Sequence, residues 1–294
     1  MIKKGIYAAS LSVINQDGTL NIDGTVNHAV DGIKNGLHGV FFFGSTGQSQ
    51  LISIKEKKEF ISKIASHKLK NQFFLGTGNN SLNENIDLIK YAMEYGFSDF
   101  LIMPPAYYKG NTDEGVFEFY KKLIKNLPKV RIILYNFEKL SGYKFSIDAV
   151  KRLVQSYPKN IIGCKDSSYN LFEKLKLPDF LMFPGTEAKL LNGLEHGCSG
   201  CISAITNVTH SLARKVFDDF ENKKTQTKND QLIAVREVFD RFNMISALHS
   251  LLSLKDDKFK NILPPLVLLS EEKKKELIEK LSNLKFVNEK NLAA

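Results

Sequence analysis

The chain has 294 residues, of which 43% are hydrophobic, 25% are charged and 11% are aromatic. This balance is typical of a globular protein with enough apolar side chains for a full core. No run approaches the ~18 uninterrupted apolar residues of a membrane-spanning helix, and the start, Met1-Ile2-Lys3-Lys4-Gly5, does not resemble a secretory signal. We therefore expect a cytoplasmic protein with no membrane segment.

The formal net charge of +9 raises the question of a nucleic-acid partner, because clustered Lys and Arg side chains bind polyanions through counterion release. The lysines are instead spread over helix-like segments such as residues 55–59 and 271–276, where acidic and basic residues alternate. Such segments are typical of solvated helix faces. We expect no nucleic-acid partner, and a nucleic-acid binder with steep salt dependence stays an alternative.

Short β-rich runs alternate with amphipathic runs, at about one strand and one helix per ~30 residues. The predicted strands are residues 6–11, 39–43, 72–76, 99–103, 131–135, 161–165, 180–183 and 200–203. Predicted helices behind Ser or Thr N-caps are residues 53–66, 81–95, 112–127 and 146–157. The strands are apolar almost throughout, as expected for strands that are buried on both faces. Eight such units predict an α/β fold, a closed (β/α)8 TIM barrel.

The alternative fold is an open doubly wound sheet, which ordinarily has a glycine-rich phosphate loop after its first strand. Residues 8–12, Ala-Ala-Ser-Leu-Ser, do not form such a loop. Beyond about residue 209 only helical patterns follow, at residues 212–220, 231–252 and 270–281. We therefore predict a barrel domain over residues 1–222 and a C-terminal helical extension over residues 223–294.

Polar side chains at the carboxyl ends of the strands are the candidates for chemistry, because the loops after these ends build the open face of a barrel. The second strand leads into Gly44-Ser45-Thr46-Gly47-Gln48, whose hydroxyl and N–H groups could hold a carboxylate. The fifth strand ends at Tyr135, the sixth at Lys165, and the seventh leads into Gly185-Thr186-Glu187.

Lys165 closes an apolar strand, so its ammonium is expected at the barrel mouth, away from bulk water. Burial disfavours the charged form of a lysine, and a neutral amine can attack a ketone to form an imine. This is the chemistry of class I aldolases. The alternative is a lysine that extends to solvent from a strand end. Tyr135, on the adjacent strand, could relay protons for such a reaction, or could simply close the barrel mouth.

Three separate motifs resemble the superfamily of N-acetylneuraminate lyase and dihydrodipicolinate synthase, the pyruvate-dependent Schiff-base lyases. The first is residues 39–48, followed by Glu56; the second is residues 135–142; the third is Gly163-Cys164-Lys165-Asp166-Ser167-Ser168. They occur in the family's order, and the resemblance covers nearly the whole chain from about Gly5.

The resemblance implies a role for each matching residue. Lys165 becomes the imine lysine, Tyr135 the proton relay, and Ser45 and Thr46 the holders of the pyruvate carboxylate. Tyr108 matches a family tyrosine that reaches into a neighbouring subunit's site, so a homo-oligomer is implied, with a tetramer favoured. The catalytic set is then Lys165, Tyr135, Thr46 and Tyr108, and the substrate-binding set is Ser45, Gly47, Leu140, Ser167, Gly185, Thr186, Glu187 and Ile202. The family needs no metal and no organic cofactor.

Departures from the family pattern bear on the substrate. Gln48 replaces the usual Glu, and Glu138 replaces the usual Pro. Leu140 stands where dihydrodipicolinate synthases have an arginine that binds the carboxylate of the aldehyde, and losing such a contact typically costs about 2–5 kcal/mol. The sequence Leu140-Ser141-Gly142 resembles the N-acetylneuraminate lyase branch instead. That branch carries an acidic pair after the loop glycine, whereas Gly185 is followed by Glu187 alone.

We therefore predict a lyase that acts on a 2-keto-3-deoxy sugar acid, with pyruvate and an aldehyde as the products or reactants. Three alternatives stay open: a dihydrodipicolinate synthase acting on pyruvate and aspartate semialdehyde, a keto-acid dehydratase of the same family, and an inactive barrel that serves as a binding module.

The cysteines, Asp166 and the histidines are expected to play no part in the chemistry. Cys164, Cys198 and Cys201 are an odd count of thiols and no second cysteine pair completes a zinc site, so reduced, packed thiols are predicted. Asp166 follows Lys165 in the strand and is expected to point away from it, because adjacent strand residues face opposite sides. No metal-ligand spacing relates the histidines His28, His38, His67, His196, His210 and His249.

Overall fold

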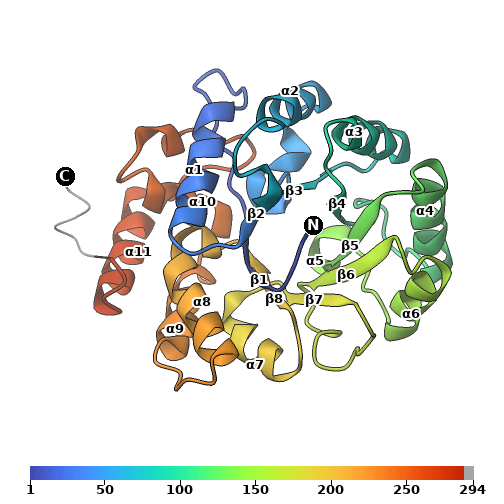
Figure 1. Ribbon diagram of the computed structural model, residues 1–294. Helices are drawn as coiled ribbons and strands as arrows, with labels where there is room; N and C mark the ends of the chain where they lie inside the picture. The colour runs from blue at the N-terminus through green and yellow to red at the C-terminus, as the bar shows by residue number, and fades with distance from the viewer. Residues whose placement is uncertain (288–294) are drawn as a thin grey trace.

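Eight parallel strands form a barrel in the computed structural model, which describes residues 1–287. Neighbouring strands pair in the order β7-β6-β5-β4-β3-β2-β1-β8, and the backbone N–H of Ser199, just before β8, donates to the carbonyl of Met182 in β7 at 2.7 Å. The strands are β1 (Gly5–Ala9), β2 (Gly39–Phe42), β3 (Phe73–Gly76), β4 (Asp99–Ile102), β5 (Arg131–Asn136), β6 (Ile161–Asp166), β7 (Leu181–Pro184) and β8 (Gly200–Ser203). The predicted (β/α)8 TIM barrel is confirmed (Figure 1).

Helices surround the barrel and continue beyond it. They are α1 (Ile22–Lys34), α2 (Ile54–Ile64), α3 (Leu82–Glu94), α4 (Asp113–Asn126), α5 (Glu138–Ser141), α6 (Ile147–Ser156), α7 (Leu190–Glu195), α8 (Thr206–Glu221), α9 (Asn229–Phe239), α10 (Met244–Leu252) and α11 (Glu271–Asn283). Polar N-caps start most of the barrel helices; at α2, Ser53 and Glu56 form a complete capping box. The C-terminal helices, coloured orange to red in Figure 1, lie at one side of the barrel.

Alternate residues of each strand face the barrel interior and the helical layer. Phe41 points inward and stacks on Phe74 with ring centroids 5.1 Å apart, whereas Phe42 points outward and meets Phe60 of α2 at 4.7 Å. The barrel interior is therefore a packed core and not a pore. Its buried apolar side chains are Ile2, Tyr7, Phe41, Phe74, Leu101, Ile133, Tyr135, Ile162, Phe183 and Ile202.

Several predicted element boundaries differ from the structure, and two of these differences bear on the site. The first strand ends at Ala9 and not at Leu11, because Leu11 donates its N–H to the Asn207 side chain instead of to a neighbouring strand. Residues 231–252 do not form one helix but two, α9 and α10. The break comes at residues 240–243, where the Asn243 side chain caps α10 by accepting the N–H of Ser246 at 3.1 Å.

This break brings the C-terminal extension over the carboxyl ends of the strands. The last barrel helix, α8, ends at Glu221, beside the boundary predicted at residue 222. The division into two domains stays a prediction, and residues 288–294 of the predicted extension lie outside the described residues. Within residues 1–287, no helix combines the length and apolar character required to cross a membrane.

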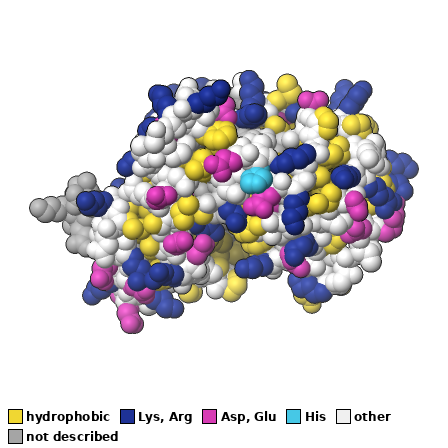
Figure 2. All heavy atoms as spheres, turned by 90° about the horizontal axis from the view of Figure 1, so that it is seen from below, with side chains coloured by type: hydrophobic (Ala, Val, Ile, Leu, Met, Phe, Trp, Pro, Cys, Tyr) yellow, Lys and Arg dark blue, Asp and Glu magenta, His cyan; other side chains and the backbone are white. Residues whose placement is uncertain are grey.

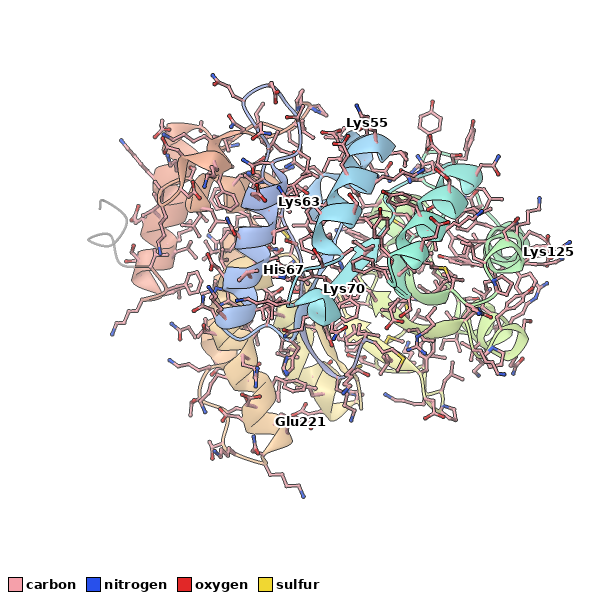
Figure 3. All side chains as sticks on the ribbon, turned by 45° about the horizontal axis from the view of Figure 1, so that its top comes forward. Lys55, Lys63, His67, Lys70, Lys125 and Glu221 are labelled. Atoms are coloured by element: carbon pink, nitrogen blue, oxygen red, sulfur yellow. The ribbon has the colours of Figure 1, made fainter. Side chains whose placement is uncertain are left out.

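The excess positive charge is distributed over the surface. Figure 2 shows Lys and Arg side chains across one face with Asp and Glu side chains between them. The lysines labelled in Figure 3 come from the outer helices and the loops beside them. Among the described residues, two of the four have acidic partners: Lys55 pairs with Glu59, and Lys63 of α2 lies 2.7 Å from Asp23 of α1. This arrangement is typical of solvated helix faces rather than of a polyanion-binding patch.

Candidate active site

A cavity of about 360 Å³ lies between the carboxyl ends of the strands and the C-terminal helices. Seven of the residues predicted for the site line it: Ser45, Thr46, Tyr135, Leu140, Lys165, Ser167 and Gly185. Seven further residues complete the lining: Phe137, Tyr169, Ala204, Arg236, Asn243, Met244 and Ile245. The predicted residues Gly47, Tyr108, Thr186, Glu187 and Ile202 do not line it.

Lys165 and Tyr135 lie side by side at the floor of this cavity. They are directly paired across β5 and β6, and the Lys165 Nζ lies 4.4 Å from the centre of the Tyr135 ring. Both are nearly buried, with 3% and 5% of their surfaces exposed. Within residues 1–287 no side chain or carbonyl forms a hydrogen bond or ion pair with the Lys165 Nζ. The amine is therefore available to a ligand in the cavity.

The Tyr135 hydroxyl connects this pair to the loop after β2. It lies 3.1 Å from the Ser45 Oγ, within hydrogen-bonding distance. Ser45 and Thr46 belong to a short 3-10 turn, η1 (Ser45–Gly47), which Phe43 and Gln48 bracket with left-handed backbone angles, φ 59° and 56°. The amine, the phenol and two hydroxyls from three strand ends thus meet in one cavity.

Gly47 holds this turn against the end of β1 instead of facing the cavity. A Cβ at this position would lie 2.8 Å from the carbonyl oxygen of Ser10, so no larger residue fits without a shift. The Gly47 carbonyl accepts a hydrogen bond from the Ser12 hydroxyl at 2.7 Å. Gly47 therefore acts on the position of Ser45 and Thr46 through the backbone.

Gln48 connects the same turn to the C-terminal extension. Its Oε1 accepts the N–H of Leu263 at 2.8 Å, and its Nε2 lies 3.4 Å from the Nε2 of buried His249. The His249 Nδ1 lies 3.1 Å from the carbonyl oxygen of Phe259. A neutral imidazole that donates from Nδ1 and accepts at Nε2 satisfies both contacts. Burial lowers the pKa of His249 to about 4.

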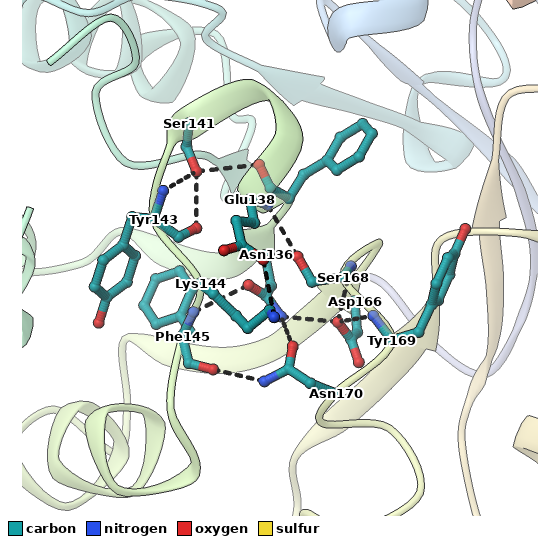
Figure 4. Close-up of polar contacts among 11 residues, drawn as sticks. Asn136, Glu138, Ser141, Tyr143, Lys144, Phe145, Asp166, Ser168, Tyr169 and Asn170 are labelled. Atoms are coloured by element: carbon teal, nitrogen blue, oxygen red, sulfur yellow. Dashed lines mark hydrogen bonds and ion pairs between the residues drawn. The ribbon is translucent and has the colours of Figure 1, made fainter. Parts of the chain in front are cut away.

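Asp166 faces away from Lys165, in agreement with strand alternation. Its carboxylate accepts the Nδ2 of Asn136 at 2.8 Å and four backbone N–H groups at 2.8–3.2 Å, those of Ser168, Tyr169, Leu171 and Phe172. Figure 4 shows Asp166 and Asn136 at the centre of this network. Asp166 therefore fixes the loop after β6 and the backbone on which Lys165 is carried.

The loop after β7 has a structural role at two of its three predicted site residues. Gly185 lines the cavity and packs so closely on Ser167 that a Cβ would lie 2.0 Å from the Ser167 Oγ. Thr186 caps a short turn by accepting the N–H of Ala188 at 3.3 Å. Glu187 is completely buried, accepts the Ser203 hydroxyl, and lies 3.4 Å from Nη1 of Arg236.

The second half of the lining comes mainly from residues that the sequence did not single out. Arg236 of α9 and Asn243, Met244 and Ile245 at the start of α10 close the cavity from the C-terminal side. Tyr169 stands beside them, and burial raises the pKa of its hydroxyl to about 12. The Asn243 N-cap before an apolar run was the only local sequence signal for this wall.

Two more predicted residues, Tyr108 and Ile202, fall outside the cavity. Tyr108 and its neighbour Tyr107 are 74% and 80% exposed on the loop after β4, with ring centroids 5.4 Å apart. Ile202 is completely buried in the barrel core below the site. The role of Tyr108 in a neighbouring subunit's site stays a prediction.

The cysteines have no ligand geometry. Cys164, Cys198 and Cys201 are all buried and free, and burial raises the pKa of each thiol. Residues 1–287 contain no group of three or more His, Cys, Asp or Glu side chains placed to hold a metal ion.

Comparisons with known proteins agree with this geometry. The model of the dihydrodipicolinate synthetase family matches residues 3–284. N-acetylneuraminate lyase of Haemophilus influenzae is 32% identical over 224 residues, which cover 73% of this chain and 74% of the relative. A DapA-like lyase of Chloroflexus aurantiacus, itself uncharacterized, is 29% identical over 281 residues, or 92% of this chain and 93% of the relative.

A solved structure shows the same fold over nearly the whole chain. The crystal structure of dihydrodipicolinate synthase from Agrobacterium tumefaciens superposes with a TM-score of 0.87 at 25% identity, covering 96% of this chain and 99% of that one. The sequence match, the strand order and the residues gathered around Lys165 lead to one conclusion. The chain belongs to the dihydrodipicolinate synthetase family.

Proposed function

We propose that the protein is a class I aldolase in which Lys165 forms an imine with pyruvate or with a 2-keto acid that yields pyruvate. The observation that supports this most strongly is the placement of Lys165. Its amine is nearly buried at a strand end, has no polar partner in the described chain, and lies 4.4 Å from the Tyr135 ring in a cavity that also contains Ser45 and Thr46.

In the proposed reaction, the neutral amine of Lys165 attacks C2 of the keto acid, and Tyr135 delivers a proton to the former carbonyl oxygen. Loss of water gives the protonated imine, which withdraws electrons from the adjacent carbon. In the cleavage direction, Tyr135 removes the proton of the C4 hydroxyl, and the C3–C4 bond breaks to give an aldehyde and an enamine. Protonation of the enamine carbon and hydrolysis then release pyruvate.

The hydroxyls of Ser45 and Thr46 are proposed to hold the carboxylate of the keto acid. They come from the 3-10 turn after β2, and Ser45 lies 3.1 Å from the Tyr135 hydroxyl. This contact would align the phenol with the carbonyl carbon that the amine attacks. A hydroxyl hydrogen-bonded to the phenol also offers a route for protons to enter and leave Tyr135.

For the substrate, we propose a 2-keto-3-deoxy sugar acid. Leu140 lines the cavity and is 39% exposed. It stands where an arginine would bind the carboxylate of aspartate semialdehyde, and an aliphatic side chain cannot bind a carboxylate in this way. A cavity of about 360 Å³ has room for a small sugar acid. N-acetylneuraminate lyase of Haemophilus influenzae, which is 32% identical, also supports a hydroxylated substrate.

We further propose that the protein works in the cytoplasm as a homo-oligomer, with a tetramer favoured. The support is the exposed pair Tyr107 and Tyr108 on the loop after β4. Two adjacent aromatic side chains that are each more than 70% exposed form an apolar projection suited to a subunit interface. Sedimentation of wild-type protein and of Tyr108→Ser would test this, and a monomeric wild type would contradict it.

Pyruvate release tests the activity itself. Purified protein would be offered a panel of 2-keto-3-deoxy sugar acids, with lactate dehydrogenase consuming the pyruvate formed, beside a synthase assay with pyruvate and aspartate semialdehyde. We expect release from at least one sugar acid, none from Lys165→Ala, and little synthase activity. Efficient turnover of aspartate semialdehyde would contradict the substrate class, and binding of pyruvate without any turnover would favour an inactive barrel.

A further inference from the structure

Arg236 enters the wall of the cavity from the C-terminal helices, outside all three motifs that suggest the function. It lies on α9, and its side chain is 9% exposed. Its Nε donates to Asp240 Oδ1 at 2.8 Å, and its Nη1 makes two long contacts of 3.4 Å with Glu187 Oε2 and Ser203 Oγ. These contacts engage Nε and Nη1 and leave the third nitrogen, Nη2.

Nη2 has no hydrogen-bond partner in the part of the chain that the structure describes. A guanidinium carries five N–H donors. Nη2 is not completely enclosed by protein, so an acceptor in the cavity can approach it. Because Arg236 lines the same cavity as Lys165, the acceptor that fits is an oxygen atom of the bound substrate.

The charge balance around Arg236 indicates which kind of oxygen this is. One guanidinium already faces two carboxylates, Asp240 at 2.8 Å and Glu187 at 3.4 Å, so this cluster has no excess positive charge for a third carboxylate. The neutral oxygen of a hydroxyl can accept the hydrogen bond without adding negative charge. The hydroxyl proton would remain free to bond elsewhere.

The surrounding wall suits a hydroxylated carbon chain. Asn243 uses its Oδ1 to accept from Ser246 at 3.1 Å, which leaves its amide NH2 as a second donor. Leu140, Met244 and Ile245 supply apolar surface for the C–H side of such a chain. Donors on one side and apolar contacts on the other are typical of sites that orient a small polar ligand.

We infer that Arg236 is a substrate-binding residue whose Nη2 donates to a hydroxyl oxygen on the aldehyde portion of the substrate, and that it gives the site a preference for neutral, hydroxylated aldehydes. The inference rests on the proposed function, because the aldehyde is defined by its reaction with the pyruvate held on Lys165. Glu187 is then a positioning residue: it holds Arg236 from behind and does not itself face the cavity.

The test is the ratio of kcat/KM for two aldehydes in condensation with pyruvate, glyceraldehyde and propanal, which differ in hydroxyl groups. Their intrinsic reactivities differ, but this difference cancels when the ratio of a variant is divided by that of the wild type. Replacing Arg236 alone would leave the Glu187 carboxylate buried with no cation beside it. The main variant is therefore Arg236→Met combined with Glu187→Gln, and Arg241→Met, on the exposed residue nearby, is the matched control.

We expect the ratio to fall at least about tenfold in the double variant, as for one lost hydrogen bond of about 1.4 kcal/mol, and to stay within about twofold in Arg241→Met. Arg236→Lys, which keeps a charge beside Glu187, should also lower the ratio and serves if the double variant does not fold. An unchanged ratio overturns the inference. The value of kcat/KM is also measured with succinic semialdehyde, an aldehyde with a carboxylate, and a loss of kcat/KM confined to this aldehyde overturns the inference as well.

Borohydride trapping of pyruvate separates this inference from the proposed function. If wild type and double variant both trap pyruvate on Lys165 and the ratio still does not change, the role of Arg236 is wrong and the proposed function stands. If wild type traps no pyruvate, the proposed function fails and the inference fails with it.

Discussion

Replacing Tyr135 with Phe removes one oxygen atom from the centre of the proposed mechanism. The ring would stay in place, because it is 95% buried in the barrel and packs 6.0 Å from Phe137 and 4.4 Å from the Lys165 Nζ. What is lost is the hydroxyl that lies 3.1 Å from Ser45. The variant therefore separates proton transfer from the shape of the cavity.

The expected magnitude follows from these contacts. A positioned proton-transfer group contributes about 10²–10⁴-fold to a rate, or roughly 3–5 kcal/mol of barrier at 1.36 kcal/mol per tenfold. One hydrogen bond between neutral groups contributes only about 1 kcal/mol to folding. We thus expect kcat for pyruvate release to fall 10²–10⁴-fold while the free energy of unfolding drops by about 1 kcal/mol or less.

Two assays check this expectation on the same preparation. Steady-state kinetics on a 2-keto-3-deoxy sugar acid give kcat and KM, and urea melts give the free energy of unfolding. Ser45→Ala is the matched control, because it removes the other partner of the 3.1 Å contact and leaves the phenol; its loss in kcat should be smaller. Near-normal kcat in Tyr135→Phe would refute the proton-relay role.

Three further predictions concern buried groups and close packing. Burial holds the pKa of His249 at about 4, below its ordinary 6.5, so between these pH values the unfolded chain binds a proton that the folded chain does not. As the pH drops from 6.5 to 4, the unfolding free energy from urea melts should therefore fall by up to about 3 kcal/mol relative to that of His249→Gln. Parallel pH curves for the two proteins would contradict this. Burial likewise lowers the pKa of Lys57 from 10.5 to about 8, so the buried charge destabilises the folded chain below pH 8. Between pH 8 and 10.5 the unfolding free energy should rise by up to about 3 kcal/mol relative to that of Lys57→Met. The absence of this rise would show that the amine titrates normally. Gly185→Ala would place a Cβ 2.0 Å from the Ser167 Oγ, so it should lower the free energy of unfolding by about 1–3 kcal/mol in thermal melts and also lower kcat/KM. Gly115→Ala, where the nearest atom is 3.5 Å away, should have neither effect. Equal behaviour of the two variants would argue against the tight contact at Gly185.

The barrel and the floor of its site were predictable from the sequence for a physical reason. Strands buried on both faces are recognisable as short apolar runs, and a barrel brings their carboxyl ends to one face. The positions of Ser45, Tyr135 and Lys165 then follow from where each run ends. The expectation that Asp166 faces away from Lys165 rests on the two-residue period of a strand and agrees with its backbone partners.

The other wall of the cavity was not predictable in this way, because it depends on contacts between distant parts of the chain. Arg236 lies on an amphipathic helix where its charge resembles that of any solvated residue, and only the packing of α9 on the turn at residues 187–189 places it at the cavity. The apolar pattern continues through residues 240–243, so one helix was expected where there are two.

The burial of Glu187 also depends on a contact between distant parts of the chain. As a lone acid in a loop after a strand, it was predicted to bind substrate. In the structure it is completely buried beneath the cavity, where Arg236 and the Ser203 hydroxyl are its partners. A carboxylate is rarely buried without such partners, but the sequence does not reveal that the partner comes from α9.

The covalent step at Lys165 is the central claim, and mass spectrometry of the intact protein tests it most directly. Wild-type protein, Lys165→Ala and Lys57→Met would each be incubated with pyruvate and borohydride, and the modified peptide would then be sequenced. We predict a single pyruvate-derived adduct on Lys165 in wild type and in Lys57→Met, and none in Lys165→Ala. Labelling of another lysine, or no labelling of the wild type, would contradict the proposed mechanism.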